Sequence, residues 1–466
     1  MKLSSTALLA LAISSITATA TAYAEPVSQD FVPTTLAGTS AQSEAKGFVE
    51  DFSLGGSTRN WYSNEHKYRG GIFEYQKHGQ TLTDRNRTNW VQGTIINASS
   101  GFTQGTVGVK TELAVYNALV LDRSKRDIKG GSNRTLADSD GNAVDQWSKL
   151  GLANVQFRVS NTTLTAGRQN FSSGIVDTIG NRALPSSFEG VSFNSEEFSN
   201  LSFQGGVFDR VSPRTEQSLS KFRTEYGNGA ESDKVYTLGA NYQPLKSLKT
   251  SFFAANVKDF WNQYYFGATH ELGDAQQLAL TTGFNYYKTV DEGKKEMGEI
   301  DNDTFSLSLG LAHQAHSLTF SYQQVNGNEY FDYLHETNGI YLANSLTSDF
   351  NGPNEKSFQI AYGINMAEYG VPGLKFNAYS ARGWDIDGTH YTGNGGRAKF
   401  AYDGIQKQDG EKHQEYGVGA SYAIQSGALK ATTVRATYVE HRGSEFQSDG
   451  SIKEFRLVTT IPFNIL

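Results

Sequence analysis

The chain has 466 residues, of which 38% are apolar and 12% aromatic, with 48 glycines, 8 prolines and no cysteine. The lack of cysteine excludes disulfide frameworks, cysteine-ligated zinc and thiol nucleophiles, and the formal net charge of −7 gives no support to nucleic-acid binding. Beyond the first two dozen residues no apolar run reaches the roughly 18–20 residues of a membrane helix, which excludes a bundle of membrane-spanning helices.

Residues 1–24 have the parts of a secretory signal peptide. Lys2 supplies positive charge, residues 8–13 form a short apolar stretch, and Ala22 and Ala24 fit the small-x-small rule for cleavage. The apolar stretch is too short to span a bilayer, which argues against the alternative of a membrane anchor. We therefore expect an exported protein in which residues 25–466 form a single domain.

The mature chain predicts strands throughout, because apolar and polar residues alternate in one segment after another. In 305–311 and 358–364 every second residue is apolar or aromatic. No comparable stretch keeps the 3.6-residue period of a helix. The pattern predicts about eighteen strands, near 46–62, 87–99, 102–117, 149–159, 162–170, 187–194, 200–209, 234–243, 248–257, 262–271, 276–288, 303–313, 316–326, 355–366, 373–382, 413–424, 429–440 and 453–465.

The connections between these strands alternate in length. Short turns such as 99–101 and 426–427 separate long polar segments near 63–86, 118–148, 210–233, 327–354 and 383–412. An even number of strands with tight turns at one end and long loops at the other is the plan of a bacterial outer-membrane barrel. We therefore predict an all-β, antiparallel transmembrane β-barrel.

The distribution of charge along the strands supports the barrel. One face of the clearest strands lacks charged residues, whereas the other face has residues such as Lys110, Glu112 and Arg456. A Lys or Arg on the lipid face at the bilayer midplane costs about 2–4 kcal/mol, so lipid outside and water inside explain this split. The alternative, a soluble β-sandwich, would pack the charge-poor face on a second sheet but gives no reason for the sorted loops.

The connection 170–187 differs from the other loops because it mixes polar residues with apolar ones such as Ile175 and Leu184. Such apolar content predicts packing against a wall, and hence a loop folded into the lumen. There it would set the size limit of the channel and bring Asp177 and Arg182 to the constriction. The alternative is an ordinary exposed loop.

Arginines at inward positions suggest what the lumen attracts. Arg158, Arg435 and Arg456 alternate with apolar neighbours, and a guanidinium offers a planar fork of donors to a carboxylate. At 4 Å one ion pair gains about 1 kcal/mol in bulk water and about 4 kcal/mol at an effective dielectric constant near 20, enough to attract a solute without trapping it. The alternative is that each arginine pairs with a neighbouring carboxylate and only fills space.

Catalytic and metal patterns are weak in this sequence. No HExxH occurs among the nine histidines, and nothing in the spacing of Ser, His and Asp brings a triad together. The acidic segment 138–145 lacks the twelve-residue calcium pattern that ends in Glu. We therefore predict neither enzyme activity nor a cofactor, with a barrel protease or lipase as the alternative function and an adhesin or phage-receptor role of the long loops as a further possibility.

Several blocks of sequence, in the same order, resemble the OprD-type porins, the outer-membrane carboxylate channels of Gram-negative bacteria. The resemblance implies an eighteen-stranded barrel in the outer membrane, surrounded by lipid and lipopolysaccharide, as a monomer or homotrimer. It also implies that the third long loop constricts the lumen, which matches 170–187. The blocks are 47–62, 89–109, 148–169, 184–210, 349–363, 371–387 and 452–463.

The resemblance further implies a ladder of basic residues that guides carboxylate-bearing solutes past an acidic counter-patch. Typical cargo would be amino acids, small peptides, aromatic acids and carbapenem-type antibiotics. With Asp177 and Arg182, the pore-lining residues expected from the aligned blocks are Arg59, Arg158, Arg168, Lys356, Arg382, Arg435 and Arg456.

This chain departs from the family pattern at several positions. Arg168 and Arg382 share the parity of Leu164 and Phe376, so each needs a bulge or a place at the rim to face the lumen. Tyr379 stands where the family has a second basic residue, which would thin the ladder. The chain also ends in leucine, whereas outer-membrane barrels usually end in an aromatic residue.

Overall fold

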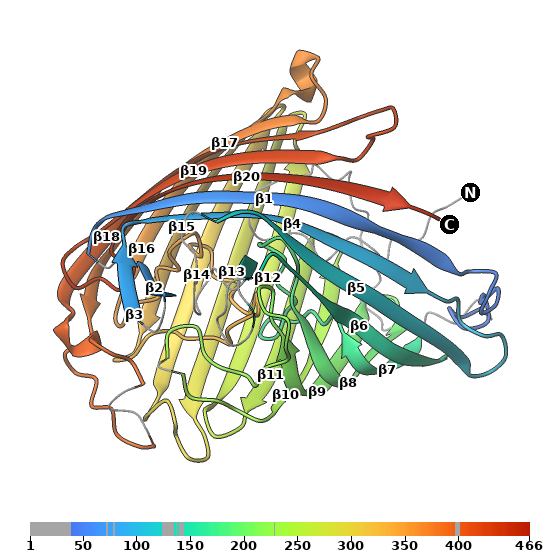
Figure 1. The fold of residues 1–466 in the computed structure, drawn as a ribbon, viewed down its shortest axis with the longest axis horizontal. Helices are drawn as coiled ribbons and strands as arrows, with labels where there is room; N and C mark the ends of the chain where they lie inside the picture. Colours follow the sequence, from blue (N-terminus) through green and yellow to red (C-terminus); the bar gives the residue numbers. More distant parts are fainter. Residues whose placement is uncertain are drawn as a thin grey trace.

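The computed structural model describes residues 39–466 except 71–72, 78–79, 124–134, 137, 139–143, 228 and 397–400. The predicted signal peptide, 1–24, lies outside the described residues. Within them, eighteen strands form one antiparallel sheet that closes on itself, which confirms the predicted barrel (Figure 1). No helix in the described part of the chain is long and apolar enough to cross a membrane.

The barrel closes where the first strand meets the last. β1 (Ser53–Arg69) pairs with β4 (Asn86–Ser99) on one side and with β20 (Ser451–Asn464) on the other, so the sheet has no free edge. Figure 1 shows this seam as the blue and red ribbons running side by side. The other barrel strands are β5 (Gly108–Arg123), β6 (Gln146–Val159), β7 (Thr162–Gln169), β8 (Ser187–Phe198), β9 (Leu201–Ser212), β10 (Val235–Leu245), β11 (Leu248–Val257), β12 (Trp261–Asp274), β13 (Leu278–Asp291), β14 (Asp301–His313), β15 (His316–Asn326), β16 (Lys356–Asn365), β17 (Leu374–Asp387), β18 (Asp409–Ala423) and β19 (Thr433–Gly443).

Short elements lie in the connections. A hairpin of β2 (Phe73–Lys77) and β3 (Gln80–Asp84) follows β1, and two 3₁₀ turns, η2 (Met366–Tyr369) and η4 (Ile405–Lys407), follow β16 and precede β18. Residues such as 160–161 and 314–315 join strands at one end of the barrel, whereas 213–234 and 327–355 join them at the other. The predicted sorting of turns and loops is therefore present, and by the plan of such barrels the long loops mark the extracellular end.

Each predicted strand overlaps an observed one, and the largest difference is at the first. It was expected at 46–62 but runs from Ser53 to Arg69. Residues 47–52 instead form local turns, in which the Phe52 backbone N–H donates to the Val49 carbonyl oxygen at 3.0 Å. The strand continues through the polar run 63–69, because the loop end of a barrel extends beyond the bilayer and needs no apolar outer face.

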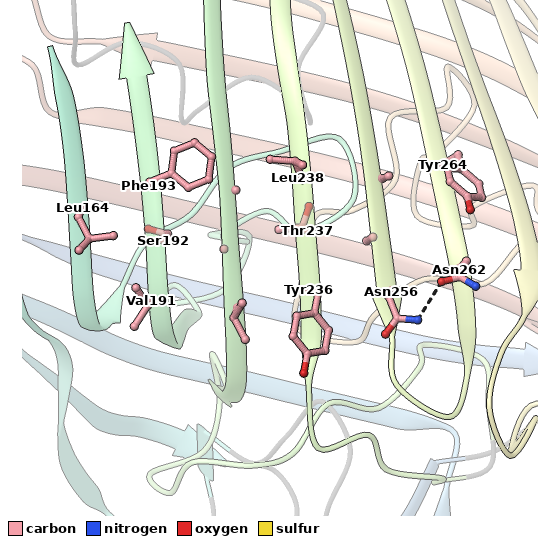
Figure 2. Close-up of a pocket in the computed structure, with 15 residues that line it drawn as sticks. Leu164, Val191, Ser192, Phe193, Tyr236, Thr237, Leu238, Asn256, Asn262 and Tyr264 are labelled. Atoms are coloured by element: carbon pink, nitrogen blue, oxygen red, sulfur yellow. Dashed lines mark hydrogen bonds between the residues drawn. The ribbon is translucent and has the colours of Figure 1, made fainter.

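The outer surface of the strands is apolar and exposed. Leu238, at 59% exposed, and Val418, at 56%, are among the large side chains on this face. Small outward residues, Gly205 and Ala254, leave a shallow groove of about 460 Å³ across β7 to β12. Figure 2 shows Tyr236 and Leu238 among the side chains that line this groove. It lies on the lipid-facing side of the barrel and not in the lumen.

The main apolar core lies inside the barrel, where three long loops fold inward and residues of the connections 292–300 and 388–408 join them. Residues of 170–186, 213–234 and 327–355 bury their apolar side chains together against the inner wall, and short β-bridges join Thr178 to Thr337 and Thr224 to Leu334. This confirms the prediction that 170–187 folds into the lumen. The inward position of the other two loops was not predicted. Fully buried members of the core are Val176, Phe188, Phe208, Phe222, Val235, Val257, Phe260, Tyr287, Met297 and Phe331.

Candidate functional site

The loop 170–186 crosses the lumen between two walls of the barrel. Near its start, Ile175 and Val176 belong to the core that the three inward loops share. Near its end, Ala183 and Leu184 pack into a second cluster around Trp61 on the inner faces of β1, β4, β5 and β6. Because both ends of the crossing are held by buried apolar contacts, the loop narrows the lumen at a fixed level.

Hydrogen bonds from the walls hold the loop backbone in place. On β1, Arg59 Nη1 donates to the carbonyl oxygens of Gly180 at 2.7 Å and Arg182 at 2.8 Å. On β13, the Tyr287 hydroxyl donates to the Gly174 carbonyl oxygen at 2.8 Å and accepts from the Tyr341 backbone N–H at 2.9 Å. Tyr287 therefore joins the loop 170–186 to the loop 327–355, and its bond to Gly174 satisfies a backbone carbonyl in a buried position.

Four arginines lie near one another on one side of the lumen, and we call them the arginine wall: Arg59 on β1, Arg182 on the loop, Arg435 on β19 and Arg456 on β20. The guanidinium carbons of Arg182 and Arg456 lie 5.3 and 5.7 Å from the centroid of the Trp61 ring. Arg435 has both Arg59 and Arg456 as electrostatic neighbours. The wall thus concentrates like charge on one side of the lumen.

The alternation of the strands explains why these arginines face inward. On β20, the outward neighbours Phe455 and Leu457 are 41% and 37% exposed, whereas Val458, at the parity of Arg456, is 8% exposed. Arg456 also pairs with Glu454, its inward neighbour, at 2.6 Å. Arg435 lies directly opposite Val458 in the β19–β20 pairing and so shares its face.

Burial and like charge act together on the loop arginine. Burial, with the neighbouring guanidiniums of Arg214 and Arg456, lowers the pKa of Arg182 to about 10. Arg182 remains protonated at neutral pH, but its charged form is less stable than that of an isolated arginine. An anion beside the wall relieves this repulsion, which favours binding of a carboxylate or a similar group.

Asp177 lies on the same loop but in different surroundings. It is 8% exposed, and its carboxylate accepts hydrogen bonds from the Tyr341 hydroxyl at 2.9 Å and the Asn338 side-chain amide at 3.2 Å. Burial raises the pKa of Asp177, although these hydrogen bonds act in the opposite direction. The loop therefore has a buried carboxylate whose charge is stabilised by hydrogen bonds from protein groups. This differs from the arginine wall, where like charges are neighbours.

A buried ion pair that the sequence analysis did not identify ties the inward loops together. Arg214 Nε lies 2.8 Å from Glu336 Oε2, with side chains 8% and 5% exposed, and Arg214 Nη1 donates to Asn181 Oδ1 at 2.5 Å. The pair is 122 positions apart in sequence, so no local pattern could reveal it. The apolar residues at 330–342 could have indicated that the loop 327–355 turns inward, in the same way that the apolar residues of 170–187 indicated it for that loop.

Arg158 shares the inner face of β6 with Asn154, near the turn end of the strand and away from the constriction. Its guanidinium carbon lies 3.8 Å from the centroid of the Phe102 ring, and its Nε donates to Gln42 Oε1 at 3.1 Å. Between this level and the loop is a polar cavity of about 230 Å³, lined by residues that include Glu112, Asn154, Gln156, Gln169, Asn170 and Gln204. Arg158 therefore belongs to the exit region of the lumen.

The structure places Arg168, Lys356 and Arg382 outside the lumen, so we do not assign them to the pore. Arg168 pairs with Glu189 at 2.9 Å, and Lys356 pairs with Asp385 at 3.0 Å. Arg382 is exposed and lies directly opposite Phe358 in the β16–β17 pairing; Phe358 is 43% exposed on the outer face. No bulge reverses their parity, and residues directly opposite each other in an antiparallel pair point to the same side.

Comparison with known proteins gives consistent matches over nearly the whole chain. A family model described as outer membrane porin, OprD family, matches residues 46–465. The chain is 36% identical over 438 residues to Porin D of Pseudomonas aeruginosa, covering 92% of this chain and 94% of that protein. It is 26% identical over 430 residues to the porin-like protein GalP of Pseudomonas putida, with coverage of 91% and 95%.

A solved structure agrees in fold. The crystal structure of OccD3 (OpdP) from Pseudomonas aeruginosa shares 46% sequence identity with this chain and has a TM-score of 0.80, covering 91% of this chain and 94% of that one. These relatives are channels and not enzymes, so the alternative of a barrel protease or lipase finds no support.

Proposed function

Because the chain belongs to the OprD family of outer membrane porins, it is a substrate-specific channel for small solutes in the outer membrane, and we propose that the solutes it selects bear a carboxylate. The observation that supports this proposal is the arginine wall beside the loop 170–186. Its guanidiniums neighbour one another, so an anion that passes the constriction lowers their mutual repulsion. Passage is diffusion down a gradient and needs no cofactor.

The opposite side of the constriction suggests a second criterion. Asp177 and the tyrosine hydroxyls beside it offer hydrogen-bond acceptors to an ammonium or hydroxyl group on the same solute. Amino acids and small peptides, which combine a carboxylate with an amine, fit both sides. Aromatic acids and carbapenem-type antibiotics fit the carboxylate requirement alone. We include all of these in the proposed substrate class.

The proposed surroundings follow from the outer face. Its exposed apolar side chains suit contact with outer-membrane lipid and lipopolysaccharide. Every part of the constriction comes from one chain, so a single barrel suffices for transport, whether the protein assembles as a monomer or as a homotrimer. Both the lipopolysaccharide contact and the assembly stay predictions.

Uptake into liposomes tests the carboxylate requirement. Three solutes of one size and shape would be compared: a carboxylate, the corresponding neutral amide and the corresponding amine. The proposal expects the carboxylate to enter fastest, with its advantage over the amide decreasing as ionic strength rises, because salt screens the wall. Equal rates for carboxylate and amide at low salt would refute it, even if the protein conducts ions.

A further inference from the structure

Two histidines and an aspartate meet at the loop end of the barrel, far from the arginine wall. His413 lies near the start of β18, His441 near the end of β19, and Asp449 in the connection 444–450. One nitrogen or oxygen atom from each of the three lies within 4.8 Å of those of the other two. Both imidazoles are buried, at 3% and 1% exposed.

The outer nitrogen of each imidazole is held by an oxygen acceptor. His441 Nδ1 lies 2.8 Å from the Gly450 carbonyl oxygen, and a carbonyl can only accept, so Nδ1 bears the hydrogen. His413 Nε2 hydrogen-bonds to the Glu355 carboxylate, which fixes a hydrogen on Nε2 in the same way. Each ring is therefore oriented with its other nitrogen toward the neighbouring ring.

These inner nitrogens, His413 Nδ1 and His441 Nε2, face each other at 2.7 Å. If each imidazole has its hydrogen on the outer nitrogen, two lone pairs point at one another, an arrangement that requires a positive charge between them. The Asp449 carboxylate beside them makes the site more favourable for a cation. The positive charge is either a proton or a metal ion.

We propose that His413 Nδ1, His441 Nε2 and the Asp449 carboxylate form a binding site for a divalent transition-metal ion of the Zn²⁺ type. Imidazole nitrogen and carboxylate oxygen are ligands that Zn²⁺ uses, and metal-binding histidines characteristically donate their other ring N–H to a carboxylate or a backbone carbonyl. The Glu355 and Gly450 contacts are of that kind.

The geometry needs only a small adjustment to accept the ion. Two nitrogens at about 2.0–2.1 Å from one tetrahedral Zn²⁺ lie roughly 3.3 Å apart, so the rings must separate slightly from their present contact. Ser348 Oγ lies 3.4 Å from His413 Nδ1 and donates to Asp449 Oδ2 at 2.6 Å, so it borders the proposed site and offers a further oxygen. The Phe350 ring, with its centroid 4.1 Å from that of His413, supports the imidazole from behind.

The ligands lie on the paired strands β18 and β19 and on the connection that follows β19, and the inward loop contacts them from the lumen side. Ser348, Phe350 and Glu355 belong to the inward loop 327–355, whereas the proposed ligands belong to two strands and the connection 444–450. A bound ion would therefore fasten the end of the inward loop to the extracellular rim. Arg435 lies at the other end of β19 from His441, so metal binding and solute selection can be measured separately.

Metal titration of the full-length protein in detergent tests the proposal. Protein freed of metal by a chelator would be titrated with Zn²⁺ alone by calorimetry, and bound metal would be counted by elemental analysis after dialysis. We expect one Zn²⁺ for each chain and a higher unfolding temperature in its presence. The visible spectrum of the Co²⁺-loaded protein should indicate tetrahedral ligation that includes nitrogen.

Two variants and one control locate the ion. His441→Gln removes a ligand and should abolish stoichiometric binding, and Glu355→Gln weakens the support of His413 and should lower the affinity by about 10–100-fold. His316→Gln alters an exposed histidine that contacts Tyr362 and should leave the affinity unchanged. Failure of the wild-type protein to bind Zn²⁺ stoichiometrically would show that a proton alone occupies the site. Equal weakening by the His441 and His316 variants would also overturn the proposal.

Discussion

The two sides of the constriction handle charge in opposite ways. Three arginines of the wall lie on strands at the barrel seam and the fourth, Arg182, lies on the loop beside them, and their guanidiniums have one another as neighbours. The acids of the inward loops are instead buried and surrounded by donors. Asp332 accepts the backbone N–H groups of Glu225, Tyr226 and Tyr333, and burial raises its pKa to about 7.

This difference shows that the net charge of a lumen does not describe what a solute meets. Burial also raises the pKa of Glu329 to about 7 and that of Asp349 to about 6, so part of the acidic charge is removed near neutral pH. In the proposed function the arginines of the wall act on solutes, whereas most loop acids hold the loops together. The following experiments separate these two roles.

Glu336→Gln should have the largest effect, which we expect on the stability of the inward loops and not directly on solute selectivity. The change leaves the Arg214 guanidinium buried without its ionic partner, which costs about 3–5 kcal/mol. We expect faster proteolysis and faster hydrogen exchange of 213–234 and 327–355. The matched control is Glu329→Gln in the same loop, which replaces a buried carboxyl that has no ion pair with another described residue and should change protection far less. Equal effects of the two substitutions would contradict the structural role of the pair.

The pH dependence of Glu336 has a defined sign. Although burial raises its pKa, Arg214 and His335 hold the pKa of Glu336 well below its usual range. Its contribution to loop stability is therefore present above the ordinary carboxyl pKa and is lost as the pH falls through the lowered value. Glu336→Gln should remove this acid-induced loss, which can be measured by proteolysis over a series of acidic buffers.

Removing two members of the arginine wall should weaken selection strongly. In Arg435→Gln combined with Arg456→Gln, each lost cation removes about 1 kcal/mol of attraction at 4 Å in water, so preference for a carboxylate over its amide should fall roughly thirtyfold. The second substitution also leaves Glu454 without its partner, which adds repulsion. Arg382→Gln, on the outer face, is the control and should leave uptake unchanged. An unchanged preference in the double variant would mean that the wall does not select.

Tyr287→Phe should loosen the constriction to a smaller extent. The substitution removes the hydroxyl that joins the two inward loops. Loss of each of its hydrogen bonds, to Gly174 and to Tyr341, costs on the order of 1 kcal/mol. We expect a larger and noisier single-channel conductance, with the sign of ion selectivity retained because the arginines remain. Tyr264→Phe on the outer face of β12 is the matched control. A conductance trace like that of the wild type would show that the hydroxyl does not position the loops.

Asp177→Asn should produce the smallest change, confined to solutes with an amine. Its carboxylate is largely engaged by Tyr341 and Asn338, so we expect about a two- to fivefold loss of preference for a zwitterion over a simple carboxylate. Burial raises the pKa of Asp177, so its carboxylate becomes protonated at a higher pH than that of an ordinary aspartate. As the pH is lowered, the wild-type preference should therefore fall to the level of the variant earlier than an ordinary aspartate would allow. A preference that is independent of pH and of this substitution would assign the second criterion to another group.

The sequence predicted the strands well because their period of two reflects a direct physical contrast between lipid and water. The same contrast failed beyond the bilayer, where 63–69 form strand without an apolar face. The alternation of residues along the strands indicated that Arg168 and Arg382 point outward, whereas the resemblance to the porin family implied that they line the pore. The structure agrees with the alternation. Contacts between distant segments, such as Arg214 with Glu336 and His413 with His441, depend on how loops pack and have no local signature.

The position of the arginine wall at the seam has a consequence for biogenesis. Arg59 Nε donates to Thr460 Oγ1, a residue 401 positions later in the chain, and the strands that bear Arg435 and Arg456 are the last two to be made. The arginine wall is therefore completed by the same event that closes the barrel. A polypeptide stalled before its final strand would contain three of the four arginines, but neither Arg456 nor the closed barrel that brings them together.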